Sequence, residues 1–329
     1  MKNIIIFGGA GFIGTNLTKR LLDAGNKVIC VDNLFTGRKS NIEQFLENSN
    51  YYWLNQDITS SDCYDVLKIL VSMVFGGKVD EIYNLACPAS PPKYQIDPVY
   101  TIHVSLAIED ICKLAIEYDA KMLHSSTSEV YGDPIVHPQT EDYRGNVNTM
   151  GPRSCYDEGK RIAETIIYEY IKKGCRAKVI RIFNTYGPYM DPNDGRVISN
   201  FVCQALLNKD ITIYGDGQQT RSFQYIDDLL DGMEAMMNTE DDFVGPVNIG
   251  SPYEFTMIEL AQLVLKKITL STSNLIYKDL PKDDPTQRKA NVDKLNSKTG
   301  WLPFRTLDEG LDKTIPYFAD ELKRVDFKF

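Results

Sequence analysis

The chain lacks the features that mark membrane, secreted or metal-binding proteins. Its apolar runs fall well short of the roughly 18 residues that a membrane-spanning helix needs, and no signal peptide precedes the first expected strand, which starts at Asn3. The seven cysteines form no CxxC pair, which is typical of reduced thiols in a cytoplasmic protein. His103, His124 and His137 have no metal-ligand spacing. We therefore expect a cytoplasmic protein with no membrane partner and no metal.

Positive charge is also scarce. The sequence has 36 lysines and arginines against 45 aspartates and glutamates, which gives a formal net charge of −9. This balance argues against nucleic acid as a partner, because such proteins present a basic surface. A few placed arginines must then meet any anionic substrate. The chain contains no low-complexity tract or internal repeat, and its 329 residues are enough for a substantial core.

The opening segment, MKNIIIFGGAGFIG, carries the clearest signal. The run Ile4–Ile6 predicts a buried parallel strand, and the glycines that follow it, Gly8, Gly11 and Gly14, have a GxxGxxG spacing. Such glycines allow a tight turn and a close approach of backbone N–H groups to a pyrophosphate. A second strand, Lys27–Val31, ends in Asp32, whose carboxylate can accept both hydroxyls of an adenosine ribose. The pattern favours NAD.

Asp32 would repel the 2′-phosphate of NADP, which is the reason for preferring NAD. Arg38 and Lys39 lie just downstream and are the counter-argument, because cations there could hold that phosphate. The alternative to a cofactor site is a strand–helix–strand unit in which the glycines serve packing alone.

Strand and helix patterns alternate through the first half of the chain. Further strands are expected at Tyr51–Leu54, Glu81–Leu85, Met122–Ser125 and Ala177–Phe183, and helices at Val99–Glu117 and Cys155–Lys172. This alternation predicts an α/β fold, a Rossmann-type doubly wound parallel sheet, with ligands beyond the carboxyl ends of the strands. We expect a cofactor domain over residues 1–185, with a returning strand near 225–250 (Val247–Ile249), and a smaller interleaved substrate-binding lobe over 186–329.

Two segments bring catalytic residue types to this sheet edge. His124–Gly132 is a strand that runs into polar residues, and Tyr156 and Lys160 open a helix four residues apart, on one face. A nearby ammonium stabilises a tyrosinate and lowers the phenol pKa toward that of a general base. A YxxxK pattern alone is a common accident, but its place after the glycine motif favours catalysis.

Several motifs together resemble the extended short-chain dehydrogenase/reductase family, the nucleotide-sugar epimerases and dehydratases. The longer ones are similar to the branch of that family that decarboxylates UDP-glucuronate. They are Asn84–Pro92, Ser126–Pro134, Gly151–Arg161, Arg181–Pro188, Asp194–Val197, Gln219–Phe223, Asp283–Pro285 and Arg288–Lys289. The resemblance covers essentially the whole chain.

The pair that follows Thr127 distinguishes the reactions of this family. Dehydratases carry Asp-Glu there, whereas this sequence has Ser128-Glu129, the decarboxylase pattern. The resemblance implies oxidation at sugar carbon 4 by NAD, loss of CO₂ from the resulting β-keto acid, and return of the hydride to give UDP-xylose. The alternatives are epimerisation or dehydration of another nucleotide sugar, and a non-catalytic NAD-binding protein, which would normally have lost one of Thr127, Tyr156 and Lys160.

The resemblance also implies three sets of site residues. The catalytic set is Thr127, Ser128, Glu129, Tyr156 and Lys160. The cofactor set is Gly8, Gly11, Phe12, Ile13, Gly14, Asp32, Asn33, Thr36, Gly37, Asp57, Ile58, Leu85, Ala86, Tyr156, Lys160 and Arg196. The substrate set is Pro91, Tyr94, Asn184, Tyr214, Arg221 and Arg288, with Arg288 expected near the sugar carboxylate or a phosphate.

The chain departs from the branch in five segments on or near the substrate side. They are Ser60–Lys78, His103–Glu109, Asp142–Gly145, Tyr189–Met190 and Ala290–Asn291. Because these departures lie on the substrate side, they bear on the identity of the sugar and not on the reaction family.

Family counterparts of the two long helices form a four-helix dimer interface, so we expect a homodimer. The apolar residues Leu106, Ile111, Leu114 and Ile167 are candidates for its buried face. Periodicity alone does not distinguish this from packing of the same residues on the sheet.

Overall fold

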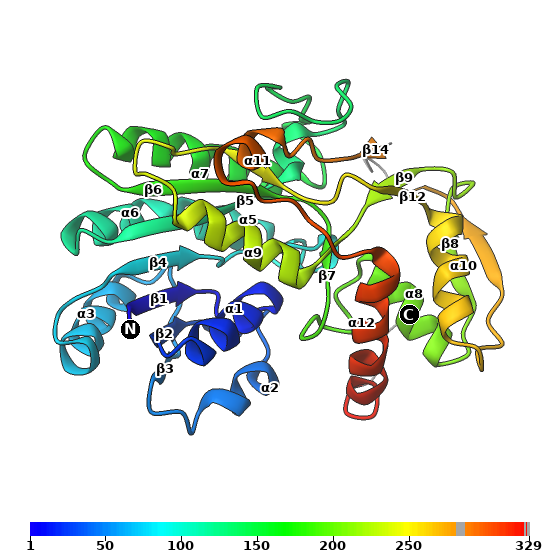
Figure 1. Cartoon of the computed structure of the whole chain (residues 1–329), viewed down its shortest axis with the longest axis horizontal. Helices are drawn as coiled ribbons and strands as arrows, with labels where there is room; N and C mark the ends of the chain where they lie inside the picture. The colour runs from blue at the N-terminus through cyan, green and yellow to red at the C-terminus, as the bar shows by residue number, and fades with distance from the viewer. Residues whose placement is uncertain (281–286, 326, 328–329) are drawn as a thin grey trace.

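A computed structural model describes residues 1–280, 287–325 and 327 of the chain. Its centre is a seven-stranded parallel sheet with the strand order β11-β6-β5-β4-β1-β2-β3 (Figure 1). The strands are β1 (Asn3–Phe7), β2 (Lys27–Val31), β3 (Tyr51–Leu54), β4 (Glu81–Asn84), β5 (Lys121–Thr127), β6 (Ala177–Ile182) and β11 (Val247–Ile249). The strand order turns back at β1, so a crevice forms beyond the carboxyl ends of β1 and β4. The Rossmann-type parallel sheet is confirmed.

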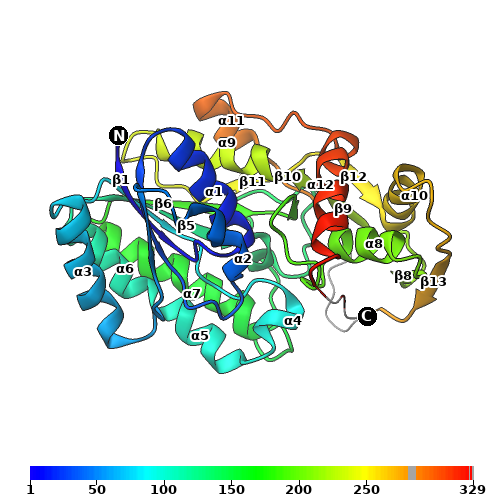
Figure 2. The same ribbon diagram turned by 90° about the horizontal axis from the view of Figure 1, so that it is seen from below.

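Helices cover both faces of the sheet, as Figure 2 shows. One layer contains α1 (Phe12–Asp23) and α9 (Ile226–Met237), and the other contains α3 (Ser61–Phe75), α5 (Pro98–Leu106), α6 (Ile108–Glu117) and α7 (Ser154–Ile171). Alternate residues of β1 face the two layers, because Ile4 and Ile6 belong to one buried cluster and Ile5 and Phe7 to the other. Burial on both faces explains the unbroken apolar run of this strand.

A smaller lobe stands beyond the carboxyl edge of the sheet, on the right in Figure 1. It contains a three-stranded sheet, β12-β9-β14, and a two-stranded sheet, β13-β8. Its elements are α8 (Val197–Leu206), β8 (Ile211–Tyr214), β9 (Thr220–Ser222), β12 (Glu254–Thr256), α10 (Met257–Lys267), β13 (Leu275–Lys278), β14 (Gln287–Arg288) and α12 (Leu307–Glu321). Short elements complete the fold: α2 (Lys39–Ile42), η1 (Glu43–Phe45), α4 (Pro91–Tyr94), η2 (Ser128–Tyr131), β7 (Thr185–Tyr186), β10 (Gln224–Tyr225) and α11 (Asp293–Thr299).

The segment β10–β11 leaves the smaller lobe and returns to the main sheet, where β11 pairs with β6. We propose on this basis that residues 1–185 with the returning strand form the cofactor unit, and that the rest of 186–329 forms the substrate lobe. Within the part of the chain that the structure describes, no helix is long and apolar enough to cross a membrane.

The long helix predicted over Val99–Glu117 is two helices, α5 and α6, which meet at Ala107. The prediction for the apolar dimer face is wrong for three of its four residues. Ile111, Leu114 and Ile167 are buried in the core of their own chain, packed beneath the sheet, and only Leu106 is exposed. Periodicity showed that these helices have an apolar face but not what that face meets.

Gly14 is required where α1 passes over the glycine loop. A Cβ atom at this position would lie 2.2 Å from the carbonyl oxygen of Gly8 and 2.6 Å from the Cα of Gly9, both in the backbone. The helix therefore lies against the loop at a distance that only glycine allows.

We predict that Gly14→Ala destabilises the protein by about 1–3 kcal/mol, because an overpacked backbone contact forces the helix away from the loop. Gly11→Ala is the control, since its Cβ would meet the Gly8 oxygen at 3.4 Å, an ordinary contact. Urea unfolding of the two variants without added cofactor tests this. Equal stability of both variants would contradict the packing argument.

Candidate active site

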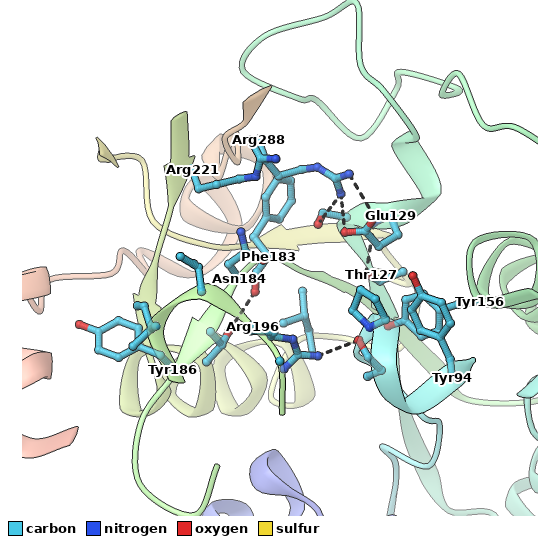
Figure 3. Close-up of a pocket in the computed structure, with 18 of the residues that line it drawn as sticks. Tyr94, Thr127, Glu129, Tyr156, Phe183, Asn184, Tyr186, Arg196, Arg221 and Arg288 are labelled. Carbon is cyan, nitrogen blue, oxygen red and sulfur yellow. Dashed lines mark hydrogen bonds and ion pairs between the residues drawn. The ribbon is translucent and has the colours of Figure 1, made fainter. Parts of the chain in front are cut away.

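A cavity of about 510 Å³ lies between the carboxyl ends of β5 and β6 and the smaller lobe. Its wall on the sheet side is formed by Ser125–Glu129, and the start of α7 adds Tyr156 and Lys160. The smaller lobe contributes Arg221 and Arg288 from β9 and β14 (Figure 3). The expected convergence of distant segments at one edge of the sheet is therefore present.

Thr127 ends β5 and turns the chain into the wall of the cavity. Its Oγ1 accepts a hydrogen bond from the backbone N–H of Glu129 at 3.2 Å and so caps the short helix η2. A threonine cap satisfies an N–H group that would otherwise lack a partner in the first turn. This local turn places Thr127 and Glu129 side by side on the cavity.

Tyr156 lies in the first turn of α7 and is held between other side chains. Its ring stacks on that of Tyr94, with centroids 5.2 Å apart and planes 4° from parallel. Burial raises the pKa of the Tyr156 phenol, and the hydroxyl of Thr127 and the charge of Arg196 act to lower it. The phenol is therefore protonated at neutral pH in this arrangement.

Lys160 lies one turn further along α7. Its Nζ donates to the carbonyl oxygen of Ser125 at 2.7 Å and lies 5.9 Å from the centre of the Tyr156 ring. Burial lowers the pKa of this ammonium. Its hydrogen bond ties the catalytic helix to β5, and its charge stands beside the tyrosine.

The carboxylate of Glu129 forms ion pairs with two arginines. Arg288 donates to both of its carboxylate oxygens, at 2.9 and 3.2 Å, and Arg153 donates to Oε2 at 2.5 Å. Burial by itself would raise the pKa of Glu129, but the two guanidinium groups outweigh it and lower the pKa to about 2. Glu129 is consequently ionised and fixed in orientation at neutral pH.

Arg288 is only 2% exposed, so it is part of the cavity wall. Besides the carboxylate, it donates to Ser128 Oγ at 2.9 Å and to the Gly132 carbonyl at 3.2 Å. Figure 3 shows its guanidinium directed at Glu129. The expected role, contact with the sugar carboxylate or a phosphate, remains a proposal.

The segment that carries Arg288 is tied down by the buried Gln139. The backbone N–H of Gln139 donates to the carbonyl oxygen of Lys289 at 2.9 Å. The backbone N–H of Lys289 donates in return to Gln139 Oε1, also at 2.9 Å. Asn248, the middle residue of β11, adds hydrogen bonds to the carbonyls of Gln139 and Asn291. These contacts fix β14 against the main sheet, so the position of Arg288 does not depend on the smaller lobe alone.

A second hollow lies across the ends of β1 and β2, and it is lined by the glycine loop and by Asp32, the residues expected to meet the adenosine half of NAD. The carboxylate of Asp32 is oriented by two backbone N–H donors, Ala10 at 2.9 Å and Leu34 at 2.8 Å. Gly8 has a φ of +79°, and a Cβ there would lie 2.7 Å from the backbone nitrogen of Ala86. Glycine is therefore required where the loop passes against the backbone that follows β4.

Most predicted residues line one of these two spaces. The larger cavity is lined by all five catalytic residues, by Phe12, Ile13, Leu85 and Arg196 of the cofactor set, and by Pro91, Tyr94, Asn184, Tyr214, Arg221 and Arg288 of the substrate set. The second hollow is lined by Gly8, Gly11, Asp32, Asn33, Thr36, Gly37, Ile58, Leu85 and Ala86.

Two members of the cofactor set, Gly14 and Asp57, line neither space. Gly14 serves the helix contact described above. The Asp57 carboxylate accepts from Tyr100 Oη at 2.9 Å and from Asn33 Nδ2 at 3.0 Å, so it supports the loop that lines the hollow. The motif Asp283–Pro285 falls outside the described residues. Among the described residues, no group of histidine, cysteine, aspartate and glutamate side chains is arranged to hold a metal.

Sequence reasoning missed Arg153 and Asp157, which flank the tyrosine in the chain. Both fall in the Gly151–Arg161 motif, but no local pattern shows that Arg153 reaches Glu129. Asp157 is buried, and its Oδ1 has no hydrogen-bond partner among the described residues. Burial and then the charge of Glu129 raise its pKa to about 7, against the opposing effect of Arg153 and Arg288.

Comparisons with known proteins agree with this geometry. The sequence profile of the NAD dependent epimerase/dehydratase family matches residues 4–250. UDP-glucuronic acid decarboxylase 1 of Danio rerio is 46% identical over 324 residues, which cover 98% of this chain and 74% of that protein.

Two solved structures share the fold over nearly the whole chain. UDP-glucose 4-epimerase from Thermotoga maritima, with UDP-glucose, has a TM-score of 0.86 and 27% identity, and 97% of this chain covers 99% of that one. UDP-glucuronic acid 4-epimerase from Bacillus cereus, in complex with UDP-glucuronic acid and NAD, has a TM-score of 0.84 and 25% identity with the same coverage.

The raised pKa of Asp157 predicts a pH-dependent stability. Between about pH 4 and pH 7 this carboxyl is ionised in the unfolded state and protonated in the folded state. The free energy of unfolding therefore falls as the pH rises through this range, and the loss levels off above about pH 7. We expect Asp157→Asn to raise the melting temperature at pH 8 by more than at pH 4.5, with exposed Asp65→Asn as control. A pH-independent difference would contradict the burial argument.

Proposed function

The chain belongs to the NAD-dependent epimerase/dehydratase family, and we propose that it converts UDP-glucuronate into UDP-xylose and CO₂ with bound NAD. The observation that carries this proposal is the carboxylate of Glu129, fixed by two arginines beside Thr127 on the wall of the cavity. The similarity of 98% of this chain to a UDP-glucuronic acid decarboxylase supports it. The second candidate, epimerisation of a UDP-sugar, is supported by the solved neighbour with UDP-glucuronic acid.

The first step is the removal of a proton from the sugar 4-hydroxyl. Bound NAD supplies the hydride acceptor for oxidation at carbon 4 and the hydride donor for the final reduction. The Tyr156 phenol lines the cavity and is protonated in the arrangement described above, so it acts as the base only after it has lost its own proton. The Lys160 ammonium, 5.9 Å from the centre of the ring, stabilises the tyrosinate that then takes the hydroxyl proton. Stacking on Tyr94 keeps the phenol in place for this transfer.

The second step is the loss of CO₂. A ketone at carbon 4 makes the neighbouring carboxylate a β-keto acid, whose carbon–carbon bond breaks with its electrons flowing into the ketone. Hydrogen bonds from Tyr156 and Thr127 stabilise the enolate oxyanion that results. Arg196 and Arg221, which also line the cavity, provide planar donors suited to a diphosphate.

The third step is protonation at carbon 5. Glu129 is ionised, since its pKa is about 2, so it acts by orienting a water molecule as a proton carrier and does not give up a proton of its own. Two arginines hold the carboxylate in one orientation, which favours delivery to one position of the enolate.

Incubation of the protein with UDP-glucuronate tests the proposal directly. We expect release of CO₂ and formation of a UDP-pentose. If the product is an epimer with its carboxylate intact, the second candidate is correct. If neither product forms but another nucleotide sugar is oxidised, the substrate assignment is wrong and the site geometry still applies.

We predict that Tyr156→Phe lowers turnover by about 10²–10⁴-fold, the usual effect of removing a general acid–base group, because the stacked ring stays and only the hydroxyl is lost. NAD binding, measured by calorimetry, should remain. Turnover close to that of the wild type would remove Tyr156 from the mechanism.

Glu129→Gln should slow CO₂ release and UDP-xylose formation far more than it weakens NAD binding, because the amide no longer pairs with both arginines. Arg288→Ala should in addition raise the KM for UDP-glucuronate. A circular dichroism melt controls for loss of folding. Near-normal CO₂ release by both variants would refute the role given to this ion cluster.

We further propose a homodimer in the cytoplasm. The seven cysteines are all free thiols, which supports a reducing compartment. Three exposed apolar residues on one face of α5, Val99, Ile102 and Leu106, supply an apolar stripe of the kind that a partner helix covers.

A dimer should scatter light with about twice the mass of the 37.3 kDa chain. Leu106→Glu should shift it toward the monomer, since a carboxylate buried in an apolar interface is strongly disfavoured. Met73→Glu, which places the same charge at an exposed position of α3, is the control and should leave the mass unchanged. A wild-type mass of one chain would rule the dimer out.

A further inference from the structure

The loop that follows β2 folds back over Asp32. A Cβ atom on Gly37 would lie 2.7 Å from Asp32 Oδ1, so the loop passes in direct contact with this carboxylate. Arg38 is the next residue, and its backbone N–H donates to the Ala10 carbonyl at 3.1 Å. The side chain of Arg38 therefore begins beside the point where the adenosine ribose of the cofactor is expected. An arginine placed there is suited to bind a 2′-phosphate with two hydrogen bonds.

The Arg38 side chain is instead held by the last turns of α12, almost 280 residues later in the chain. Its Nη2 donates to the carboxylate of Glu321, and its Nη1 donates to Tyr317 Oη at 3.4 Å. The side chains of Arg38 and Glu321 are only 16% and 10% exposed. Another acidic group with influence on Arg38 is Asp191, which is itself paired with Lys93 at 2.9 Å.

A pair this deeply buried does not open easily. If Arg38 turned toward a phosphate, it would leave the Glu321 carboxylate largely buried without its partner, and an uncompensated buried charge is strongly unfavourable. The exposed Arg324 approaches Glu321 only at 3.8 Å and is not an equivalent replacement. Arg38 is consequently unavailable for the cofactor while Glu321 is charged and in place.

We infer that Glu321 is a cofactor-specificity residue, which acts by holding Arg38 away from the ribose. Asp32 repels a 2′-phosphate, and Glu321 withholds Arg38, an arginine beside the ribose position that would otherwise compensate. This inference rests on the proposed placement of the adenosine ribose beside Asp32. It removes Arg38, one of the two cations that follow Asp32 in this loop, as an argument for NADP binding.

The test measures cofactor binding by calorimetry on the cofactor-free full chain, in a background of Asp32→Ser that removes the direct repulsion. Adding Glu321→Gln should raise the affinity for NADP about tenfold, the worth of one charge-assisted hydrogen bond, and leave the affinity for NAD unchanged. The further change Arg38→Ala should abolish this gain. Asp320→Asn, which removes an exposed charge from the neighbouring position of α12, is the matched control and should produce no gain.

Three results would overturn the inference: an unchanged NADP affinity in Asp32→Ser/Glu321→Gln, a gain that survives Arg38→Ala, or an equal gain from Asp320→Asn. If Glu321→Gln does not fold, the comparison of Asp32→Ser with Asp32→Ser/Arg38→Ala decides the question. Equal NADP affinities support the inference, and a several-fold loss on removal of Arg38 contradicts it. No UDP-sugar is needed, so failure of the decarboxylase proposal would not produce any of these results. If Asp32→Ser has the same ratio of NAD affinity to NADP affinity as the wild type, the placement of the ribose beside Asp32 is refuted instead.

Discussion

The ion cluster of Glu129, Arg288 and Arg153 is the interaction on which the site depends. It joins the end of β5, the residue before α7, and β14 of the smaller lobe. A buried carboxylate is stable only when its charge is fully paired, so the three segments must meet in one arrangement. The contact of β14 with the sheet edge and the fixed orientation of Glu129 therefore have the same physical cause.

Two further networks support this cluster from behind. Gln139 and Asn248 fix the segment after Arg288 to the main sheet. Glu164, one turn beyond Lys160 on α7, accepts from Ser126 Oγ at 2.5 Å and pairs with Arg181 of β6 at 2.7 Å. Glu164 thus holds β5, the strand that carries Thr127, to α7 and to β6. A bond cleavage that depends on orientation requires such rigid support.

Features that depend on local spacing could be predicted from the sequence. The glycine loop, Asp32, and the pair Tyr156 and Lys160 are recognisable because turn chemistry and helical periodicity place them within a few residues of a strand end. The partners of charged groups could not be predicted in this way: Arg153 and Glu129 are 24 residues apart and Arg288 and Glu129 are 159 apart. Nor does periodicity show what an apolar face meets: Ile111 and Leu114 fit a dimer interface as well as a core, and only the structure shows that they pack under their own sheet. The protonated state of Asp157 likewise arises from burial and from the charge of Glu129, which only the folded chain brings near.

The central claim is that one site oxidises carbon 4, releases CO₂ and reduces carbon 4 again without releasing the keto intermediate. The most direct test is to convert UDP-glucuronate deuterated at carbon 4 in ordinary water, mixed with UDP-glucuronate that has no deuterium and carries ¹³C in the sugar. The account predicts that deuterium remains at carbon 4 of the UDP-xylose formed from the same molecule. Loss of deuterium to water, its appearance in the ¹³C-labelled product, or release of a free keto sugar or of a 4-epimer that keeps its carboxylate would contradict this sequence of steps.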